Sequence, residues 1–546
     1  METTINEKKA LTATTHRASR QSWNGSPEMI ATDEETIRTM LLNLEDELYV
    51  IRANGGVGIA RGGEIGKREN GGLDLLAILP PQEIETLGDP NFNRFYGTRF
   101  AYYGGAMASG IASAAMVIAL GKAGFIGSFG AAGLSPARIE AAIQQIQAEL
   151  PDGPYAFNLI HSPSEEALER NAVDLYLRYH VRVVEASAFM DLTPHIVYYR
   201  AAGLSQAPDG KIVIGNKVIA KVSRREVASK FMQPAPEKLL DALLQAGKIS
   251  QQQAQLARKV PMADDVCVEA DSGGHTDNRP LVCLMPAMLA LRDELQEKYQ
   301  FEQPVRVGAA GGISTPASAL AAFAMGAAFI CTGTVNQACV ESGACEHTKA
   351  LLAKASMADV MMAPSADMFE MGVKVQVLKT GTMFAMRASK LYELYSKYES
   401  IEEIPADERE KLEKQVFKRS LEDIWAETIQ FFTERDPEQI ARANDNPKRK
   451  MALIFRWYLG LSSRWSASGE KGRELDYQIW CGPSIGPFND WTRGTYLAEP
   501  QNRHVVDVAR QIMTGSAYLA RVQSLRNAGV QVSARLSSYY PDSAMI

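Results

Sequence analysis

The stretch Val266-Cys267-Val268-Glu269-Ala270-Asp271-Ser272-Gly273-Gly274-His275 ends an apolar, strand-like run in a glycine turn that is followed by a histidine. Paired glycines let a backbone approach a flat ligand closely. A loop histidine at the end of a strand is typical of the catalytic face of an α/β enzyme. Two further glycine signals, Gly311-Gly312-Ile313 and Thr332-Gly333-Thr334, end the next two apolar runs. Together the three signals predict a cofactor phosphate held beside a catalytic imidazole.

Around this stretch, short apolar runs alternate with amphipathic helical segments, which predicts parallel β/α architecture. The runs that we interpret as strands are 100–104, 124–128, 155–160, 181–186, 218–222, 265–269, 305–309 and 328–332. Eight such strands close most naturally into a (β/α)8 TIM barrel of the α/β class. An open doubly wound sheet is the alternative, but no G-x-G-x-x-G turn opens the first helix, which disfavours a dinucleotide-binding half.

The helices between these strands carry recognisable start signals. Ser135-Pro136 and Thr315-Pro316 each place a cap before a proline at the first helical position. Ser223 with Glu226 predicts a capping box. Residues 233–260 have the pattern of a helical hairpin, which we interpret as an insertion between strands five and six.

The rest of the chain divides into segments of different character. With 546 residues, two or three domains are expected. Residues 1–30 are polar and predict a disordered lead, and residues 31–98 predict an N-terminal module of one helix and a glycine-punctuated β region. The barrel would occupy residues 99–355. Residues 356–546 predict a mostly helical C-terminal region.

Composition excludes several classes of function. Lys plus Arg total 58 against 64 Asp plus Glu, so the formal net charge of −6 argues against nucleic acid as a partner. No apolar stretch is long enough for a membrane span, and no signal peptide is evident. The six cysteines form no C-x-x-C pair, which indicates reduced thiols of a cytoplasmic protein. Cys339 and Cys345 with His347 match no standard zinc spacing, so no metal site is expected.

Several strand ends carry side chains suited to chemistry. His275 is the candidate general acid, because an imidazole titrates near neutral pH. Asn158 could bond the edge of a heterocycle, and Lys221 could offer charge to a phosphate or a reduced ring. Gly105-Ala106-Met107 would let a flat ring lie against the backbone. The alternatives remain open at this point: a structural histidine, an asparagine that satisfies a loop, a solvated lysine and tight helix packing.

The sequence resembles a known family. The run from Glu269 to Pro280 is similar to the signature of PfaD-type proteins, the enoyl reductase subunits of bacterial polyunsaturated fatty acid synthases, which have relatives acting in trans on polyketide synthases. The resemblance extends from about residue 40 to beyond 530. It includes the stretches 155–164, 216–222, 261–265, 366–372 and 454–465. The barrel is more distantly similar to nitronate monooxygenases and to FMN-dependent enoyl-acyl-carrier-protein reductases.

The resemblance implies FMN as cofactor and NADPH or NADH as reductant. The FMN phosphate would lie near Gly312, Gly333 and Thr334, and His275 would be catalytic. The other cofactor-binding residues would be Gly105, Ala106, Met107, Asn158, Lys221, Gly273, Gly274 and Gly311. Reduced FMN would pass hydride to the β-carbon of a 2-enoyl thioester, and His275 would protonate the α-carbon or stabilise the enolate oxygen.

The implied partner is an acyl carrier protein of the synthase, and a homodimer is also expected from the family. Acyl carriers are usually acidic, so a basic surface is needed, for which Arg224-Arg225 and Lys448-Arg449-Lys450 are candidates. Three rival interpretations remain: an FMN-dependent nitronate monooxygenase-like oxidase, a phosphosugar or nucleotide barrel without flavin, and a non-catalytic assembly subunit.

Overall fold

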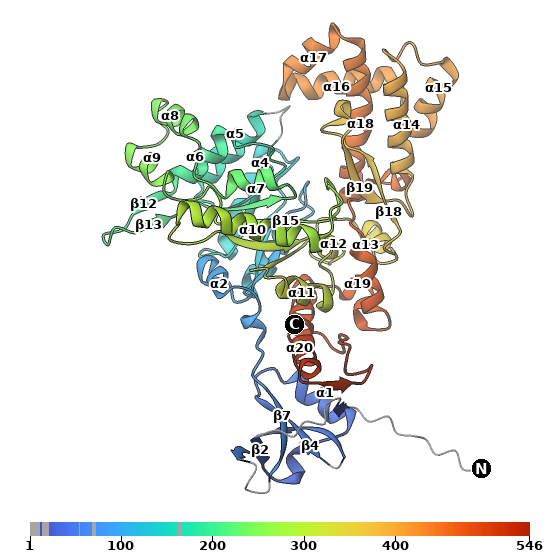
Figure 1. Ribbon diagram of the computed structural model, residues 1–546. Coiled ribbons are helices and arrows are strands. Elements are labelled where there is room, and N and C mark those ends of the chain that lie inside the picture. Colours follow the sequence, from blue (N-terminus) through green and yellow to red (C-terminus); the bar gives the residue numbers. More distant parts are fainter. Residues whose placement is uncertain (1–10, 14–20, 54, 68–71, 162–165, 546) are drawn as a thin grey trace, which may run out of the picture.

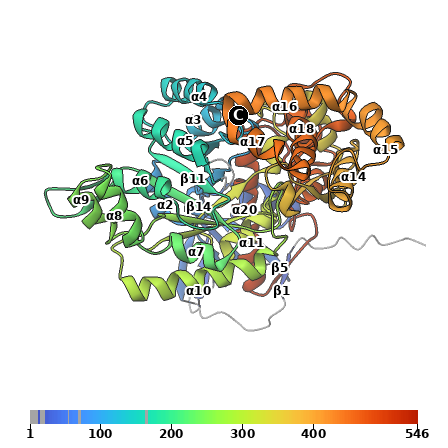
Figure 2. The same cartoon turned by 90° about the horizontal axis from the view of Figure 1, so that it is seen from above.

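A computed structural model describes residues 11–13, 21–53, 55–67, 72–161 and 166–545. A small N-terminal sheet, a barrel and a largely helical part make up the molecule (Figure 1). Seen from above, helices of the C-terminal part lie beside the barrel helices (Figure 2). Within these described ranges, no helix is long and apolar enough to cross a membrane.

Eight parallel strands form the closed barrel. They are β8 (Tyr102–Gly104), β9 (Ile126–Phe129), β10 (Ala156–Ile160), β11 (Val183–Ser187), β14 (Lys217–Val222), β15 (Asp265–Glu269), β16 (Arg306–Ala310) and β17 (Ile330–Thr332). Each strand pairs with the next barrel strand along the chain, and β17 pairs with β8 to complete the ring. Every strand overlaps its predicted run, so the (β/α)8 prediction is confirmed and the open-sheet alternative is wrong.

Helices follow the strands in the expected alternation. They are α3 (Ala114–Lys122), α4 (Pro136–Glu149), α5 (Glu166–Arg178), α6 (Pro194–Ala202), α7 (Arg225–Phe231), α10 (Leu281–Tyr299), α11 (Pro316–Ala324) and α12 (Thr334–Gln337). Pro136 and Pro316 begin their helices as predicted. The capping box predicted at Ser223 is wrong. Arg224 is the N-cap of α7, and Ser223 Oγ donates instead to the Asp277 carboxylate at 2.6 Å, a stronger acceptor than a neutral group.

The predicted helical hairpin lies between the fifth and sixth strands of the barrel. Its helices are α8 (Glu237–Gln245) and α9 (Gln251–Ala257). Ser250 and Gln253 cap α9 reciprocally, at 3.1 and 2.9 Å. A second, unpredicted hairpin of β12 (Leu204–Gln206) and β13 (Ile212–Ile214) precedes β14.

The amino-terminal end of the barrel is closed by α2 (Pro90–Tyr96), which precedes β8. Tyr96 donates its hydroxyl to Asp265, and Arg306 donates to the same carboxylate at 2.6 and 2.7 Å. The guanidinium of Arg306 also lies 4.6 Å from the centre of the Phe95 ring. This largely buried cluster fills the amino-terminal end of the barrel.

In its described residues, the N-terminal module is a six-stranded sheet with the nine-residue helix α1. Its elements are β2 (Gln21–Asn24), η1 (Pro27–Met29), β3 (Ile30–Ala31), α1 (Glu34–Leu42), β4 (Leu48–Ala53), β5 (Gly56–Arg61), β6 (Glu64–Lys67), β7 (Leu73–Leu79) and η3 (Ile84–Thr86).

The expected disordered lead is wrong for the described part of residues 1–30. Besides β2, residues Leu11–Ala13 form β1, which pairs with β20 (Val530–Val532) at the other end of the chain. Trp23 is buried and donates its indole N–H to Gly62 O at 2.8 Å. The pairing partners lie far away in sequence, so local composition could not reveal these strands. Residues 1–10 and 14–20 fall outside the described residues.

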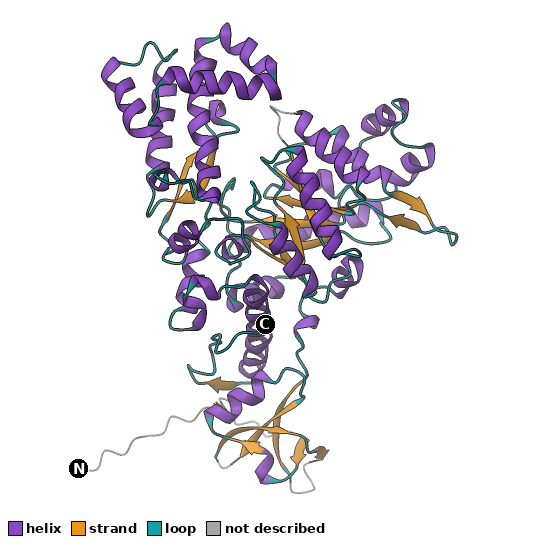
Figure 3. Ribbon diagram, turned by 180° about the vertical axis from the view of Figure 1, so that it is seen from behind, coloured by secondary structure: helices purple, strands orange, loops and turns teal. Residues whose placement is uncertain are grey.

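The C-terminal region is mostly helical, as predicted (Figure 3). Its elements are α13 (Glu346–Leu352), β18 (Val360–Pro364), η4 (Phe369–Met371), β19 (Lys374–Leu378), α14 (Phe384–Lys397), α15 (Ala406–Lys411), the π-helix η5 (Leu412–Phe417), α16 (Leu421–Arg435), α17 (Pro437–Asn444), α18 (Pro447–Ser468), η6 (Glu474–Asp476), α19 (Ile485–Thr492), η7 (Tyr496–Ala498), η8 (Pro500–Asn502) and α20 (Val505–Asn527). The antiparallel hairpin β18–β19 was not predicted, and it contacts the barrel mouth directly.

Candidate active site at the carboxyl ends of the barrel strands

A layer of polar side chains lies inside the barrel near the carboxyl ends of its strands. Side chains two residues apart point to the same side of a strand. Ala156, Val183, Ile219 and Cys267 belong to the apolar cluster inside the barrel. The residues two positions further along the same strands are Asn158, Glu185, Lys221 and Glu269. The strand alternation therefore places one amide, one ammonium and two carboxylates in one layer, next to this apolar cluster on its carboxyl side.

Lys221 is held between the two carboxylates of this layer. Its Nζ lies 2.9 Å from Glu185 Oε1 and 3.7 Å from Glu269 Oε1. Glu185 is completely buried, and its other oxygen accepts from the Tyr103 hydroxyl and, at 2.9 Å, from the backbone N–H of Ala106. Glu185 therefore connects the lysine to the loop after β8.

Burial and neighbouring charges shift the pKa of each ionisable side chain in this layer. Burial alone would raise the pKa of Glu185, but the Lys221 ammonium and the donors Tyr103 and Ala106 lower that pKa below its usual value. Burial opposes the charge of Lys221, yet Glu185 and Glu269 raise the pKa of the lysine well above its usual value. Burial raises the pKa of Glu269. A permanent cation thus lies under the barrel mouth.

The loop after β8 lies close to β17, the strand that pairs with β8 to close the barrel. The N–H of Gly105 donates to Thr332 O at 3.0 Å, and a Cβ on Gly105 would lie 2.7 Å from Cys331 Sγ. Ala106 and Met107, which follow, are partly exposed at the mouth. Asn158 is buried and donates its amide to Glu185 O at 3.2 Å and to Ser187 Oγ at 2.8 Å. The side-chain NH2 group of Asn158 therefore donates both of its hydrogen bonds to residues of β11.

The loop after β15 carries the predicted histidine and packs against the C-terminal region. A Cβ on Gly273 would lie 2.8 Å from the backbone N of Cys481, so only glycine allows this approach. Gly274 has φ +79° and exchanges two backbone hydrogen bonds with Gln376 of β19, at 2.9 and 2.7 Å. The Gln376 amide also donates to Asp271 and to Ser272 O. The hairpin β18–β19 thus holds the histidine loop.

His275 faces a carboxylate that sequence reasoning missed. Its Nε2 lies 3.3 Å from Asp367 Oδ1, and the two side chains are 37% and 45% exposed. Burial would lower the pKa of His275, but Asp367 and Glu269 raise it above its usual value. The imidazole is therefore held in its protonated form to a higher pH than a free histidine.

The glycine turns after β16 and β17 border the same mouth. Gly311 and Gly312 have φ of +77° and +76°, and Gly311 lies against the backbone of Ala270. A Cβ on Gly312 or on Gly333 would meet nothing within 4 Å. Gly333 is the N-cap of α12, and the Thr334 hydroxyl accepts from Gly482 N at 3.1 Å. The turns leave space where side chains would otherwise stand.

Two buried polar atoms near these turns lack a hydrogen-bond partner among the described residues. They are Ser314 Oγ, two residues after Gly312, and Gln337 Nε2, one turn after Gly333. Buried polar groups are nearly always hydrogen-bonded, so these two atoms and the open glycines fit a polar ligand group.

The predicted site residues thus border one barrel mouth, at the carboxyl ends of six of the eight strands. Glu185, Asp367 and Gln376 were missed. Glu185 could have been found from the strand alternation in Val183–Ser187, and Asp367 lies in the quoted stretch 366–372. Nothing in the sequence indicated that Gln376 reaches the histidine loop.

Known families match three parts of the chain. Residues 101–391 match the nitronate monooxygenase family, and residues 23–81 match the N-terminal domain of the fatty acid synthase subunit PfaD. Residues 398–477 match the inserted helical domain of [acyl-carrier-protein] S-malonyltransferase. The matched segments correspond to the barrel with the start of the C-terminal region, to the N-terminal sheet, and to the helices around α16–α18.

Individual proteins are similar over most of the chain. A polyunsaturated fatty acid synthase subunit of Thraustochytrium sp. is 51% identical over 500 residues, which cover 90% of this chain and 33% of that protein. Polyketide biosynthesis protein PksE of Bacillus subtilis is 48% identical over 444 residues, 81% of this chain and 58% of that protein. The chain thus spans from a third to somewhat over half the length of these relatives.

A solved structure is similar as well. The crystal structure of the enoyl reductase domain of MlnA, from the macrolactin biosynthesis cluster of Bacillus amyloliquefaciens, is matched with a TM-score of 0.77 and 39% identity. The match covers 81% of this chain and 100% of that domain. The chain therefore belongs to the PfaD-type enoyl reductase family of polyunsaturated fatty acid and polyketide synthases, built on the barrel of the nitronate monooxygenases.

Proposed function

We propose that this chain is an FMN-dependent enoyl reductase that reduces the 2,3 double bond of 2-enoyl thioesters on an acyl carrier protein, with NADPH or NADH as reductant. One observation carries the proposal: the His275 imidazole, whose pKa Asp367 raises, and the Lys221 ammonium lie near or after the carboxyl ends of neighbouring strands beside the two open glycine turns. The similarity to the MlnA enoyl reductase domain supports the same reaction.

The residues of the mouth fit a flat ring with a phosphate tail. Backbone N–H groups at Gly312, Gly333 and Thr334 would hold the phosphate, because such glycine turns leave donors free for an anion. The unpartnered Ser314 hydroxyl would add a donor. The ring would lie over Gly105–Met107 and Gly273–Gly274, with Lys221 beneath it and the amide oxygen of Asn158 at its edge.

FMN, when bound, would supply the hydride chemistry, with the pyridine nucleotide as the electron source. The chain supplies the rest. Saturation of the double bond adds one hydride to the β-carbon and one proton to the α-carbon, so the site needs an acid. His275 would donate that proton, or would stabilise the negative charge that develops on the thioester oxygen. The carboxylate of Asp367 raises the pKa of that acid, and the Lys221 ammonium would stabilise added negative charge at the mouth.

A carrier-bound substrate is supported by the family's context. One relative is a subunit of a polyunsaturated fatty acid synthase, and the helical segment 398–477 matches a domain of an enzyme that acts with acyl carrier protein. Acyl transfer and enoyl reduction share no chemistry, so the carrier is the feature that the two enzyme types would have in common. The expected homodimer stays a prediction.

The test combines a spectrum with an anaerobic assay. The purified protein should show flavin absorption, and it should consume NADPH without oxygen when a crotonyl thioester is present. His275→Ala should keep the bound flavin but lose at least about a hundredfold in kcat, which is the usual contribution of a general acid. A colourless protein whose NADPH consumption is unchanged by the thioester would contradict the proposal.

A nitronate monooxygenase-like oxidation is the second candidate, since residues 101–391 match that family. It requires a nitronate and oxygen instead of a pyridine nucleotide. Oxygen uptake with propyl-2-nitronate, in the absence of NADPH, would favour this reaction over enoyl reduction.

A further inference from the structure

One residue of the C-terminal region, Gln376 of β19, bonds the loop around His275 through every polar group it has. We call residues 271–278 the histidine loop. The backbone N–H and the amide NH2 of Gln376 donate to this loop, and its two oxygens accept from it. The bonds are with Gly274 O and N at 2.7 and 2.9 Å, with Ser272 O at 2.7 Å, with Asp271 Oδ1 at 2.8 Å and with Asn278 Nδ2 at 3.2 Å. Gln376 is 5% exposed, so water does not compete for these bonds.

The histidine loop is closed at its ends, and its tip carries His275. Asn278 donates to Asp271 Oδ1 at 2.9 Å, which joins the two ends. At the tip, Gly274 directly precedes His275 and has φ +79°, a conformation that glycine adopts without steric cost. Glycine also leaves the backbone freer than other residues do. The two bonds that Gly274 exchanges with Gln376 therefore restrict the backbone next to the imidazole.

Strand β19, which carries Gln376, is itself held along both edges. On one edge it pairs with β18, where Met362 lies opposite Gln376. Along the other edge, next to the histidine loop, runs the segment 477–481. Leu378 N donates to Ile479 O at 2.8 Å, and Cys481 N donates to Gln376 O at 3.3 Å. Gln376 therefore cannot shift without breaking the pairing of its neighbours.

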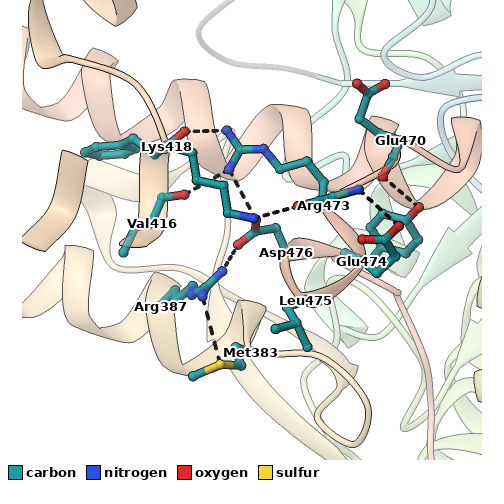
Figure 4. Close-up of polar contacts among 12 residues, drawn as sticks. Met383, Arg387, Val416, Lys418, Glu470, Arg473, Glu474, Leu475 and Asp476 are labelled. Atoms are coloured by element: carbon teal, nitrogen blue, oxygen red, sulfur yellow. Dashed lines mark hydrogen bonds and ion pairs between the residues drawn. The ribbon is translucent and has the colours of Figure 1, made fainter. Parts of the chain in front are cut away.

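The segment 477–481 follows Asp476, whose buried carboxylate anchors it. Arg473 lies 3.2 Å and Lys418 3.6 Å from this carboxylate, and Arg387 also pairs with it (Figure 4). Arg387 comes from α14, Lys418 directly follows the π-helix η5, and Arg473 directly precedes η6. Breaking a buried ion pair is costly. The cluster thus keeps the segment, and the strand beside it, in one place.

The same hairpin supplies the carboxylate that faces the imidazole. Asp367 lies between β18 and β19, and its Oδ1 is 3.3 Å from His275 Nε2. One hairpin thus contacts the histidine loop at two points: Gln376 bonds the backbone, and Asp367 faces the ring. The separation of ring and carboxylate depends on the backbone contact, because a loop released by Gln376 would carry the imidazole away from a carboxylate that stays with the hairpin.

We propose that Gln376 is a positioning residue for His275, which holds the imidazole against Asp367 at the barrel mouth. The inference rests on the proposed function for its effect on the reaction, because the acid is needed when the thioester is reduced and not when NADPH reduces the flavin. Gln376 should therefore matter for one half of the catalytic cycle. The placing of the imidazole can be measured without any substrate.

The first test measures the imidazole in the absence of turnover. The seven histidines are labelled isotopically and titrated by NMR, and His275→Ala identifies the signal of His275. Gln376→Met has a side chain of similar length and keeps the backbone bonds but loses the amide. The pKa of His275 should fall in this variant, because the ring loses Asp367 while its burial and Glu269, at the end of its own strand, stay. A pKa equal to that of the parent protein would overturn the positioning role.

Val375→Ala is the matched control. Val375 is also on β19 and 1% exposed, but as the neighbour of Gln376 it points to the other side of the strand. This change loosens the packing of the hairpin and should leave the pKa of His275 unchanged; an equal fall in both variants would overturn a specific role of Gln376. If Gln376→Met does not fold, Gln376→Asn takes its place, since its amide is one methylene shorter and should not reach Ser272 and Asp271.

The second test separates the two halves of the catalytic cycle by anaerobic rapid mixing. In Gln376→Met, NADPH should reduce the bound flavin at the parent rate. Reoxidation by crotonyl-pantetheine should slow at least about tenfold, because a displacement of about 1 Å in a reacting group can cost roughly a hundredfold. Equal slowing of both halves would contradict the inference. If the parent protein binds no flavin, or NADPH does not reduce it, the proposed function is wrong and the NMR titration alone decides on Gln376.

Discussion

Asp367 belongs to a hairpin loop in the C-terminal region, yet its carboxylate lies 3.3 Å from the imidazole of the barrel residue His275. The loop is held by Phe369, which is buried against Tyr392 and Tyr395, and by the ion pair of Glu370 with Arg456 at 3.3 Å. The protonation of the candidate acid therefore depends on a residue outside the barrel.

Replacing Asp367 with Asn should shift the pH dependence of the reaction. Without the carboxylate, burial dominates and the pKa of His275 falls, so the alkaline limb of kcat/KM moves to lower pH. Below that limb the variant should keep most of its activity, because His275 is then protonated in both proteins. Asp367→Glu should restore much of the profile. An unshifted limb would show that Asp367 does not control the acid.

Removing the Lys221 ammonium should destabilise the barrel. Lys221→Met leaves the fully buried Glu185 without its cation, which costs about 3–5 kcal/mol of unfolding free energy. Urea unfolding at pH 7 measures the loss. The deficit should shrink toward pH 5, because the carboxyl, no longer held at a low pKa, takes up a proton there. The double variant Lys221→Met, Glu185→Gln should recover most of the stability; full additivity of the two losses would contradict this account.

At the scale of elements, the segment 476–482 and the loop after β15 interlock through two glycines. A Cβ on Gly273 would meet the backbone of Cys481, and a Cβ on Gly482 would meet the backbone of Gly273 and Ser272. Backbone atoms cannot move away from an added Cβ as the end of a flexible side chain can. This contact, with the bridge from Gly274 to Gln376, attaches the hairpin β18–β19 to the barrel mouth.

Two glycine-to-alanine changes at this mouth should therefore have different effects. Gly273→Ala forces the two loops apart and should cost about 1–3 kcal/mol of stability, as overpacking does, together with activity. Gly333→Ala meets no atom within 4 Å, so stability should stay unchanged, while the added methyl group fills the space proposed for the phosphate. Unfolding curves and flavin content of the purified variants check both. Unchanged flavin in Gly333→Ala would argue against that phosphate position.

At the scale of the whole molecule, α20 joins the N-terminal sheet to the barrel (Figure 1). Ser516 on α20 donates to Pro316 O at the start of α11 at 3.0 Å. Further along α20, the buried guanidinium of Arg521 donates to Asn43 O at 2.8 Å, to Leu44 O at 3.0 Å and to Pro80 O at 3.3 Å. The last long helix thus satisfies carbonyls that end α1 and the sheet.

Arg521→Met should loosen the N-terminal module without unfolding the barrel. Several buried carbonyls would lose their donor, at a cost of about 2–3 kcal/mol localised to residues 21–81. Hydrogen exchange should rise in β4 and β7 and stay unchanged in β14 and β15. Arg535→Ala is the control, because Arg535 is 60% exposed in its ion pair with Glu35 and such pairs contribute little. An equal rise in hydrogen exchange in all four strands would contradict a local effect.

Local sequence patterns were enough to predict the barrel, and the glycine turns and histidine at its mouth. Eight apolar runs, the glycine turns and His275 are encoded by residues close in sequence, because strand alternation and turn geometry are local properties. The pairing of Leu11 with Val532, the approach of Asp367 to His275 and the capture of Arg387, Lys418 and Arg473 by Asp476 join residues from distant segments. Such contacts exist only once packing brings those segments together, so the carboxylate that raises the pKa of His275 was supplied by the tertiary structure.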